Sequence, residues 1–324
     1  MSEHQQWAFR ESLQPKADET QFDLARMLDA MVLIRAEVPE DAHSAPTLGT
    51  ERGGYGSVIR EDGLVLTIGY LVREASQIWL TTNRGAVVAG YLLAHDQATG
   101  FALVQPLGKL DAPALRRGLS SDVNAGDYTF VLGHGGRAHA LKTRLIAKRE
   151  FVGYWEYLVD EALFTAPAHP QWGGAALLDV QGDLIGIGSL LVQQEVNGEA
   201  TQVNMFVPID LLSPILDAML QTGRSPHPPR PWLGMYTQDP EGKLVVGRLS
   251  AGGPAERAGV QAGDMVLEVG ARRVHGLAEL FRAVWRLGAP GVDVPLTLAR
   301  DGEVHRITIK SADRNDFLKK PNLH

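Results

Sequence analysis

Ten histidines are the residues of this sequence best suited to proton transfer near neutral pH, and cysteine is absent. The absence of cysteine excludes disulfides, thiol nucleophiles and zinc–thiolate sites. A serine hydrolase would need an activated hydroxyl, an imidazole that takes its proton and a carboxylate that orients the imidazole. The histidines form no H-E-x-x-H pattern or comparable metal-ligand spacing, so the sequence predicts neither a metal site nor a cofactor.

The stretch from His169 to Leu177 has the form of a loop that could present a nucleophile. It reads H-P-Q-W-G-G-A-A-L, a turn of small residues that leads into an apolar strand. It contains no serine, and the closest serines belong to other elements: Ser120, Ser121 and Ser189. A rebuilt site around a histidine stays open, with three candidates: His134, His139 and His169. The spacing favours none of them, and a lone histidine at a loop end is more often structural than catalytic.

The elements that must position this loop are short strands. Apolar segments of strand length alternate with turn signals from residue 56 to about 191, which indicates an antiparallel barrel or sandwich. A helix at 208–220 and the proline-rich run S-P-H-P-P-R-P then separate this region from a second unit of mixed type. The predicted organisation is an arm at 1–21, a first domain at 22–223, a linker at 224–231, a second domain at 232–313 and a tail at 314–324.

Composition is that of an ordinary soluble protein, with 44% hydrophobic and 21% charged residues in a chain of 324. The net charge of −7 leaves no basic surface for nucleic acid and disfavours an anionic membrane. The first 20 residues are polar and contain no apolar run of signal-peptide type. The chain as numbered is therefore expected in the cytoplasm, or in the periplasm if a leader has been removed.

Several motifs occur in an order that is more specific than any one of them. In the first domain these are G-S-V-I-R-E-D-G-L-V-L-T at 56–67, A-H-D-Q-A-T-G-F-A-L-V at 94–104, L-S-S-D at 119–122 with V-L-G at 131–133, and M-F-V-P at 205–208. In the second they are R-P-W-L-G-M at 230–235 and S-A-G-G-P-A-E-R-A-G-V-Q-A-G-D-M-V at 250–266. Together they resemble the HtrA/DegP family. The resemblance implies a mainly β fold, a trypsin-like double antiparallel barrel followed by a small α+β PDZ domain.

The resemblance places all three catalytic positions of that family on unsuitable residues. The family histidine falls on Tyr70, the aspartate on Gly100 and the serine on Gly173. Glycine has no side chain, and a phenol with an unperturbed pKa near 10 is a poor base at neutral pH. The family's oxyanion loop corresponds to Gln171, Trp172 and Gly173, whose N–H groups could still converge. Trp172 either fills the space of the lost site or is ordinary packing.

The second domain keeps the features that the resemblance links to peptide binding. The N–H groups of Leu233, Gly234 and Met235 are expected to bind the C-terminal carboxylate of a peptide. A helix at 277–287 carries apolar residues at helical spacing. From this helix, Leu280 and Val284 are expected to line the peptide groove and to favour an apolar C-terminal side chain.

The sequence therefore predicts an inactive HtrA-like pseudoprotease that binds peptide C-termini or unfolded polypeptide as a chaperone-like, scaffold or regulatory protein. The alternative is an active serine-type or metal-assisted peptidase with a relocated site. The resemblance implies a homotrimer, or a mixed oligomer with an active homologue. It also gives Trp7, Phe9 and the first helix a role at the subunit interface. Neither nucleic acid nor membrane is expected as a partner.

Overall fold

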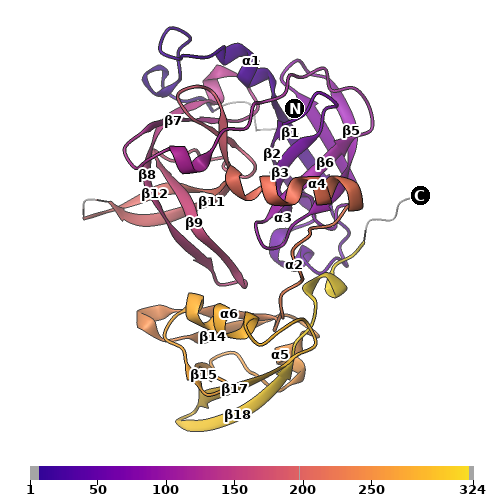
Figure 1. Ribbon diagram of the computed structural model, residues 1–324, viewed down its shortest axis with the longest axis vertical. Helices are drawn as coiled ribbons and strands as arrows, with labels where there is room; N and C mark the ends of the chain where they lie inside the picture. Colours follow the sequence, from indigo (N-terminus) through magenta and orange to yellow (C-terminus); the bar gives the residue numbers. More distant parts are fainter. Residues whose placement is uncertain (1–6, 197, 321–324) are drawn as a thin grey trace. The chain divides into compact units, whose positions relative to one another are not determined.

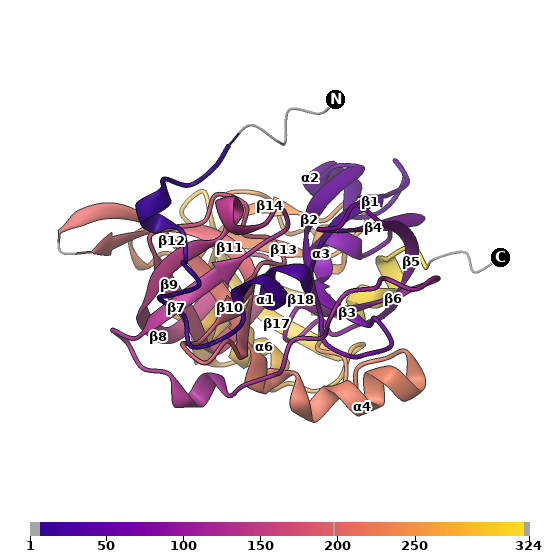
Figure 2. The same cartoon turned by 90° about the horizontal axis from the view of Figure 1, so that it is seen from above.

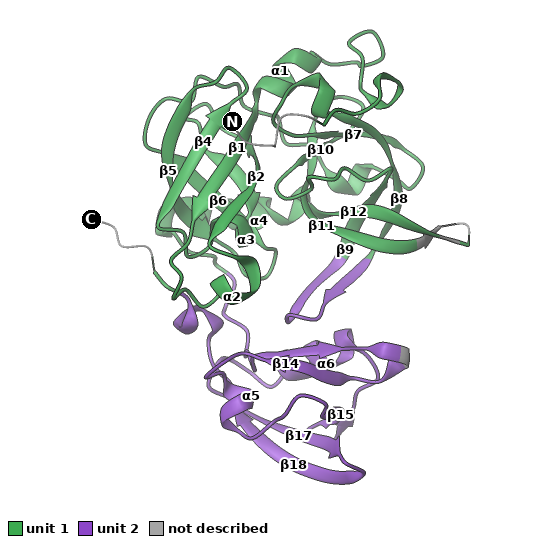
Figure 3. Ribbon diagram, turned by 180° about the vertical axis from the view of Figure 1, so that it is seen from behind, with its two compact units in different colours: residues 1–149, 161–226, 319–324 green, residues 150–160, 227–318 purple. Residues whose placement is uncertain are grey.

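The computed structural model describes residues 7–196 and 198–320 and divides the chain into two compact units. The first unit contains residues 1–149, 161–226 and 319–324, and the second contains residues 150–160 and 227–318 (Figure 3). This division differs from the predicted domains: residues 150–160, expected in the first domain, join the second unit, and the predicted tail is divided between the two units at residue 319.

The first unit consists of two closed antiparallel barrels (Figure 1). The first barrel contains β1 (Met31–Glu37), β2 (Glu51–Val58), β3 (Val65–Ile68), β4 (Gln77–Thr82), β5 (Val87–His95) and β6 (Phe101–Pro106), in the order β1-β2-β3-β6-β5-β4. The second contains β7 (Tyr128–Leu132), β8 (Leu141–Gly153), β9 (Tyr157–Ala166), β10 (Ala176–Leu178), β11 (Leu184–Val196) and β12 (Glu199–Pro208), in the order β10-β11-β12-β9-β8-β7. The predicted barrel architecture is confirmed.

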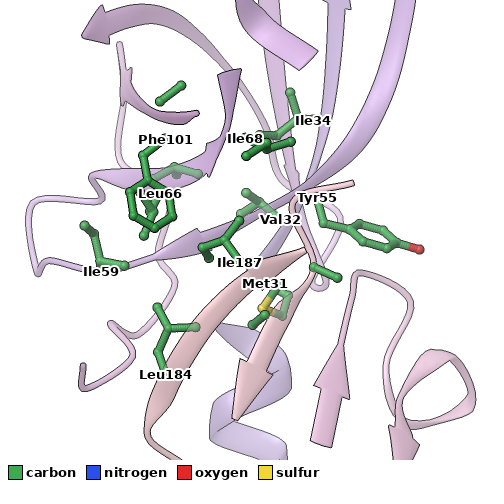
Figure 4. Packing of buried hydrophobic residues seen from close by; sticks show 14 of the residues in the cluster. Met31, Val32, Ile34, Tyr55, Ile59, Leu66, Ile68, Phe101, Leu184 and Ile187 are labelled. Atoms are coloured by element: carbon green, nitrogen blue, oxygen red, sulfur yellow. The ribbon is translucent and has the colours of Figure 1, made fainter. Parts of the chain in front are cut away.

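The barrels form because their strands bury apolar side chains at close spacing. All residues of β3 are buried, and Leu66 and Ile68 lie in the core beside Phe101 of β6 (Figure 4). Gly56 is required in β2, because a β-carbon there would lie 2.4 Å from Cγ1 of Val65. This packing fixes the two strand ends, at Ile68 and at Phe101, from which the candidate site begins.

Short helices close the barrels. They are α1 (Leu24–Asp29), α2 (Ala45–Leu48), α3 (Gly69–Val72) and α4 (Ser213–Thr222), the last of which packs against β5 (Figure 2). Asp23 caps α1 by accepting a hydrogen bond from the N–H of Arg26 at 3.1 Å. Helix α4 ends at Gly223, whose φ of +65° is the left-handed conformation typical of a helix C-terminus.

The second unit is an antiparallel sheet covered by two helices. Its strands are β13 (Met235–Gln238), β14 (Val245–Leu249), β15 (Met265–Val269), β16 (Arg272–Arg273), β17 (Asp293–Arg300) and β18 (Glu303–Lys310), and its helices are α5 (Pro254–Arg257) and α6 (Leu277–Trp285). The strand order β13-β14-β15-β17-β18 leaves β13 at an edge, with β16 paired to β15.

Two further segments belong to this second unit. One is the tip of the β8–β9 hairpin, residues 150–160 (Figure 3). The other is the start of the predicted tail, which is ordered: Arg314–Phe317 forms a 3-10 helix, and the ring of Phe317 packs on that of Trp232 at 4.8 Å. Arg314 itself is buried, so the predicted tail begins packed against this unit. In the described part of the chain, no helix has the length and apolar character needed to cross a membrane.

Candidate functional site

The structure brings the three positions of the expected catalytic triad together. Tyr70 lies on α3, directly after β3, and Gly100 directly precedes β6, which pairs with β3. The N–H of Gly69 donates to the carbonyl of Gly100 at 2.7 Å. A β-carbon built at Gly173 would lie 2.8 Å from the hydroxyl oxygen of Tyr70. The alignment of these positions is therefore consistent with their neighbourhood in space.

Tyr70 is a hydrogen-bond donor in this site. Its hydroxyl donates to the carbonyl of Ser189 at 2.9 Å. Burial raises the pKa of this phenol far above its ordinary value, and a hydrogen bond with the Trp172 side chain opposes the rise only in part. A general base near neutral pH needs a pKa near 7. Tyr70 is therefore neutral and unsuited to activate a nucleophile.

The neighbourhood of Gly100 contains acidic and imidazole groups with structural contacts. Gly100 has a φ of +82°, the left-handed region that glycine adopts without strain. One carboxylate oxygen of Asp96 accepts from the N–H of Thr99 at 2.7 Å, and the other accepts from the hydroxyl of Ser225. The ring of His95 packs against Gly69, because a β-carbon at Gly69 would lie 2.4 Å from its Nε2. Asp96 is thus used to close a turn.

The loop before Gly173 is held by His169, which is fully buried. Its Nδ1 accepts from the N–H of Gln171 at 3.1 Å, so its Nε2 carries the proton and donates to the carbonyl of His139 at 2.9 Å. Its own N–H donates to Oδ1 of Asn204 at 2.6 Å. Burial lowers the pKa of His169 to about 4, so the ring is neutral at pH 7. With both ring nitrogens bonded to backbone, His169 is a structural anchor.

This arrangement changes the expected oxyanion loop. The N–H of Gln171 points to the His169 ring, so it does not converge with those of Trp172 and Gly173. Gly173 instead offers its carbonyl, which accepts from the N–H of Tyr55 at 2.8 Å. Gly174 follows with a φ of +75°. Of the three N–H groups that could converge, that of Gln171 is therefore already bonded to the neutral, buried imidazole of His169.

A carboxylate already lies in the expected peptide-binding loop of the second unit. Oε1 of Glu156, at the tip of the β8–β9 hairpin, accepts from the N–H groups of Gly234 at 2.9 Å and of Leu233 and Met235 at 3.3 Å each. Gly234 has a φ of +74°, which turns the three donors to one side. Burial raises the pKa of Glu156 to about 7, although Arg314 and the three amides act in the opposite direction.

Comparison with known proteins agrees with both halves of the chain. A model of the trypsin-like peptidase domain matches residues 54–187, and a model of the PDZ domain matches residues 231–311. A protein of Halomonas elongata named "Probable periplasmic serine endoprotease DegP-like" is 29% identical over 283 residues, covering 82% of this chain and 57% of that protein. Serine endoprotease DegS of Haemophilus influenzae is 22% identical over 266 residues, covering 79% and 76%.

Solved structures share the fold. The HtrA-type protease AlgW with a decapeptide has a TM-score of 0.53 at 20% identity, covering 92% of this chain and 98% of that one. A serine endoprotease of Yersinia pestis has a TM-score of 0.51 at 21% identity, covering 89% and 95%. The chain has a trypsin-like peptidase domain and one PDZ domain, and it shares the fold of HtrA-type proteases. It spans only 54% to 62% of the length of three DegP-like relatives.

Within the PDZ domain, the groove residues chosen from the sequence are deeply buried. Leu280 is 1% exposed and Val284 is 2% exposed, and both belong to the core cluster of this unit. Val152 of the β8–β9 hairpin packs against the same cluster. Their role in lining a groove stays a prediction, whereas the three N–H groups of the carboxylate loop do converge on one oxygen.

In the peptidase domain, the other histidines considered for a relocated site also have structural neighbours. Nε2 of His134 lies 3.2 Å from the carbonyl of Thr82. The ring of His139 packs edge-on against Trp7 at 4.6 Å, and Phe9 packs on His169 at 5.1 Å. The two aromatic residues of the arm thus anchor it to its own domain. Among residues 7–196 and 198–320, no group of three or more histidine and acidic side chains is placed to hold a metal ion.

Sequence reasoning missed Glu156. Strand β8 continues to Gly153 and β9 returns from Tyr157, so the two strands form a long hairpin whose turn carries Glu156. Glu156 has a φ of +60°, an uncommon conformation for a residue other than glycine. The run Y-W-E at its tip resembles any polar and aromatic turn, and nothing in it signals a ligand for residues 78 positions further along the chain.

Proposed function

We propose that this chain is a pseudoprotease, with an inactive HtrA-type peptidase domain and a PDZ domain that binds peptide C-termini or unfolded polypeptide. The observation that carries the proposal is the contact at Gly173, where the Tyr70 hydroxyl lies 2.8 Å from the place of a β-carbon. A side chain at the position expected for a nucleophile would therefore meet the partly buried phenol of Tyr70. The proposal rests on this contact together with the lack of a hydroxyl at 173 and a carboxylate at 100.

The chemistry of the surrounding groups supports the same proposal. A serine nucleophile would require an imidazole within about 3 Å and a carboxylate behind it. The phenol in the imidazole position is neutral and donates to the carbonyl of Ser189, so Tyr70 offers no general base to a group at residue 173. The loss of the Gln171 N–H to His169 also weakens stabilisation of an oxyanion. Backbone donors alone supply only a small residual rate.

An activity assay tests the peptidase half of the proposal. The purified chain is incubated with a fluorophosphonate probe and with labelled casein, beside the Haemophilus influenzae DegS protein as a reference. We expect neither labelling nor cleavage, and we expect Gly173→Ser alone to stay inactive, because Tyr70 and Gly100 remain. Labelling or turnover by the unmodified chain that disappears on one substitution, or on addition of a chelator, would instead establish the alternative of a relocated or metal-assisted site.

Binding tests the PDZ half. The convergence of three N–H groups on a carboxylate oxygen supports recognition of C-terminal carboxylates, since a PDZ domain adds an extended peptide to a sheet edge and holds its end with backbone donors. Immobilised protein is exposed to a random decapeptide library with free C-termini and to the same library amidated, and retained peptides are identified by mass spectrometry. Retention that does not depend on the free carboxylate would contradict this mode of binding.

Assembly and compartment are part of the proposal. We expect a homotrimer, or a mixed oligomer with an active homologue, and light scattering on the purified chain together with co-purification from its host would distinguish the two. A monomeric mass with no co-purifying homologue would refute both. The periplasmic names of the DegP-like relatives favour the periplasm over the cytoplasm for this chain. Fractionation of host cells tests this assignment.

A further inference from the structure

The carboxylate loop of the PDZ domain is filled by a side chain of the same chain. Oε1 of Glu156 accepts hydrogen bonds from Leu233, Gly234 and Met235, and its Oε2 also lies 3.3 Å from the N–H of Leu233. These are the donors that a peptide's terminal carboxylate would use. A second carboxylate cannot occupy the same three donors, so an external C-terminus and Glu156 exclude each other.

The backbone beside Glu156 follows the path that a bound peptide would take. The carbonyl of Tyr154 accepts from the N–H of Thr237 at 3.3 Å, on the edge strand β13. Nη1 of Arg314 donates to the carbonyl of Trp155 at 3.2 Å. Residues 154–156 therefore present two carbonyls and one carboxylate to the PDZ domain. The outward N–H groups of an edge strand are the usual place where an extended peptide adds to a sheet.

Side-chain contacts hold the rest of the hairpin tip in place. Nη2 of Arg282, on α6, lies 2.5 Å from a carboxylate oxygen of Glu150 on β8 and 2.5 Å from one of Asp160 on β9. Arg282 thus bridges both strands of the hairpin. Val152 adds an apolar contact by packing against the core cluster of the PDZ domain. Glu156 has a left-handed backbone conformation that most residues other than glycine avoid. This conformation directs its carboxylate into the loop.

We propose that the tip of the β8–β9 hairpin, residues 150–160, is an internal ligand of the PDZ domain, and that an external C-terminus binds by displacing Glu156. The inference rests on the proposed C-terminal binding, because it names the regulation of that same site. The docked hairpin lowers the apparent affinity for external peptides in proportion to the population of the docked state. Removal of one charge-assisted hydrogen-bond partner from the docked state corresponds to about a tenfold change in such an equilibrium.

Amide hydrogen exchange followed by NMR tests the internal ligand without any external peptide. In the full chain the amides of Leu233, Gly234 and Met235 are expected to be protected, and Glu156→Ala is expected to speed their exchange by about tenfold or more. The amides of Ser250 and Ala255 donate to the carbonyls of Gly234 and Leu233, so their protection should persist and report an intact loop. Unchanged exchange at residues 233–235 in Glu156→Ala would overturn the proposal.

Matched variants distinguish the effect of releasing the docked hairpin from the effects of removing a charge or unfolding the domain. Glu156→Gln removes the charge at nearly constant size, and Glu161→Gln makes the same change on an exposed part of β9 beside Lys148. Arg282→Ala releases the hairpin from the α6 side, with the exposed Arg286→Ala as its control. The Glu156 and Arg282 variants are expected to behave alike and both controls to match the unmodified chain. Faster exchange in the controls would assign the effect to charge, which overturns the proposal.

The random decapeptide library then separates this inference from the proposed function. The Glu156→Ala chain is expected to retain free-carboxylate peptides about tenfold more than the unmodified chain, and neither should retain the amidated library. Equal retention by the two chains refutes displacement while leaving C-terminal binding intact. No carboxylate-dependent retention by Glu156→Ala, in which exchange shows the loop to be open, refutes C-terminal binding and with it the displacement.

Discussion

A single β-carbon added at position 173 tests the packing on which the proposed inactivity rests. In Gly173→Ala the new carbon would lie 2.8 Å from the hydroxyl oxygen of Tyr70, closer than real β-carbons come to such atoms. The next neighbours, the methyl carbons of Leu71, are at 3.6 and 3.7 Å, an ordinary contact distance. The strain is therefore confined to one atom, the Tyr70 hydroxyl.

The size of the effect follows from what Tyr70 must give up. To move away from the new β-carbon, the Tyr70 hydroxyl must lengthen its 2.9 Å hydrogen bond to the carbonyl of Ser189. Ser189 is only 4% exposed, so its carbonyl would be left without a donor. Overpacking of a core costs about 1–3 kcal/mol, and an unsatisfied buried acceptor costs a similar amount. We expect Gly173→Ala to lower the free energy of unfolding by about 2 kcal/mol. Tyr70→Phe alone, which also removes the donor to Ser189, should cost about the same.

A double-mutant cycle isolates the contact. In Tyr70→Phe combined with Gly173→Ala, the offending oxygen is gone, so the pair should cost no more than Tyr70→Phe alone and the coupling energy should be about 2 kcal/mol. Urea unfolding followed by tryptophan fluorescence measures it, with Gly53→Ala as the control, since a β-carbon there has its nearest neighbour at 4.0 Å. Strict additivity of the two substitutions would show that Tyr70 does not occupy the space in front of residue 173.

Three further outcomes follow from other contacts of the chain. Burial lowers the pKa of His169 from 6.5 to about 4, so the neutral ring contributes about 3 kcal/mol to the free energy of unfolding above pH 6.5, and this contribution is lost as the pH falls toward 4. The same acid unfolding curve for His169→Asn and the unmodified chain would contradict this. Gly174→Ala should lower the free energy of unfolding by about 3 kcal/mol or more, because the new β-carbon would lie 1.8 Å from the carbonyl oxygen of Tyr55. Thermal unfolding measures this, and an unchanged stability would refute the loop geometry. Asp264 is fully buried and pairs with Arg300 at 2.6 Å, so Asp264→Asn should destabilise the PDZ domain by about 3 kcal/mol. A loss of unfolding free energy no larger than that measured on breaking an exposed ion pair would show that this ion pair is not structural.

The fold could be predicted from the sequence because its signals are local. Short apolar runs and turn residues indicated an antiparallel barrel or sandwich, and the resemblance carried by the motifs implied the double barrel. The same resemblance placed Tyr70, Gly100 and Gly173 at the three catalytic positions of the family. The structure brings these residues together through the pairing of β3 with β6 and the contact of Tyr70 with residue 173. The carboxylate loop was expected from the resemblance of residues 230–235 to the loop that opens PDZ domains, and its three N–H groups do converge on one oxygen.

The partners of those positions could not be predicted, since they are distant in the chain and carry no local signal. Tyr70 donates to the backbone of Ser189, and any residue type at 189 offers the same carbonyl. The capture of the Gln171 N–H by His169 depends on burial that leaves the imidazole neutral. Glu156 reaches the carboxylate loop because it lies in the turn between β8, which ends at Gly153, and β9, which begins at Tyr157, and no local pattern signals that contact.

Two sites of this chain are filled by its own side chains, and the physical difference between them bears on function. Tyr70 lies beside the barrel core, and its displacement would break a partly buried hydrogen bond to Ser189 without replacing it. Glu156 sits at a hairpin tip, where a ligand carboxylate can take over its three N–H donors one for one. Replacement of Glu156 by a ligand carboxylate therefore costs little free energy beyond undocking the hairpin. Displacement of Tyr70, in contrast, would expose only Gly173 at the position expected for a nucleophile. We infer that the regulated property of this chain is peptide binding, and that the peptidase domain contributes to it through the strands that carry Glu156.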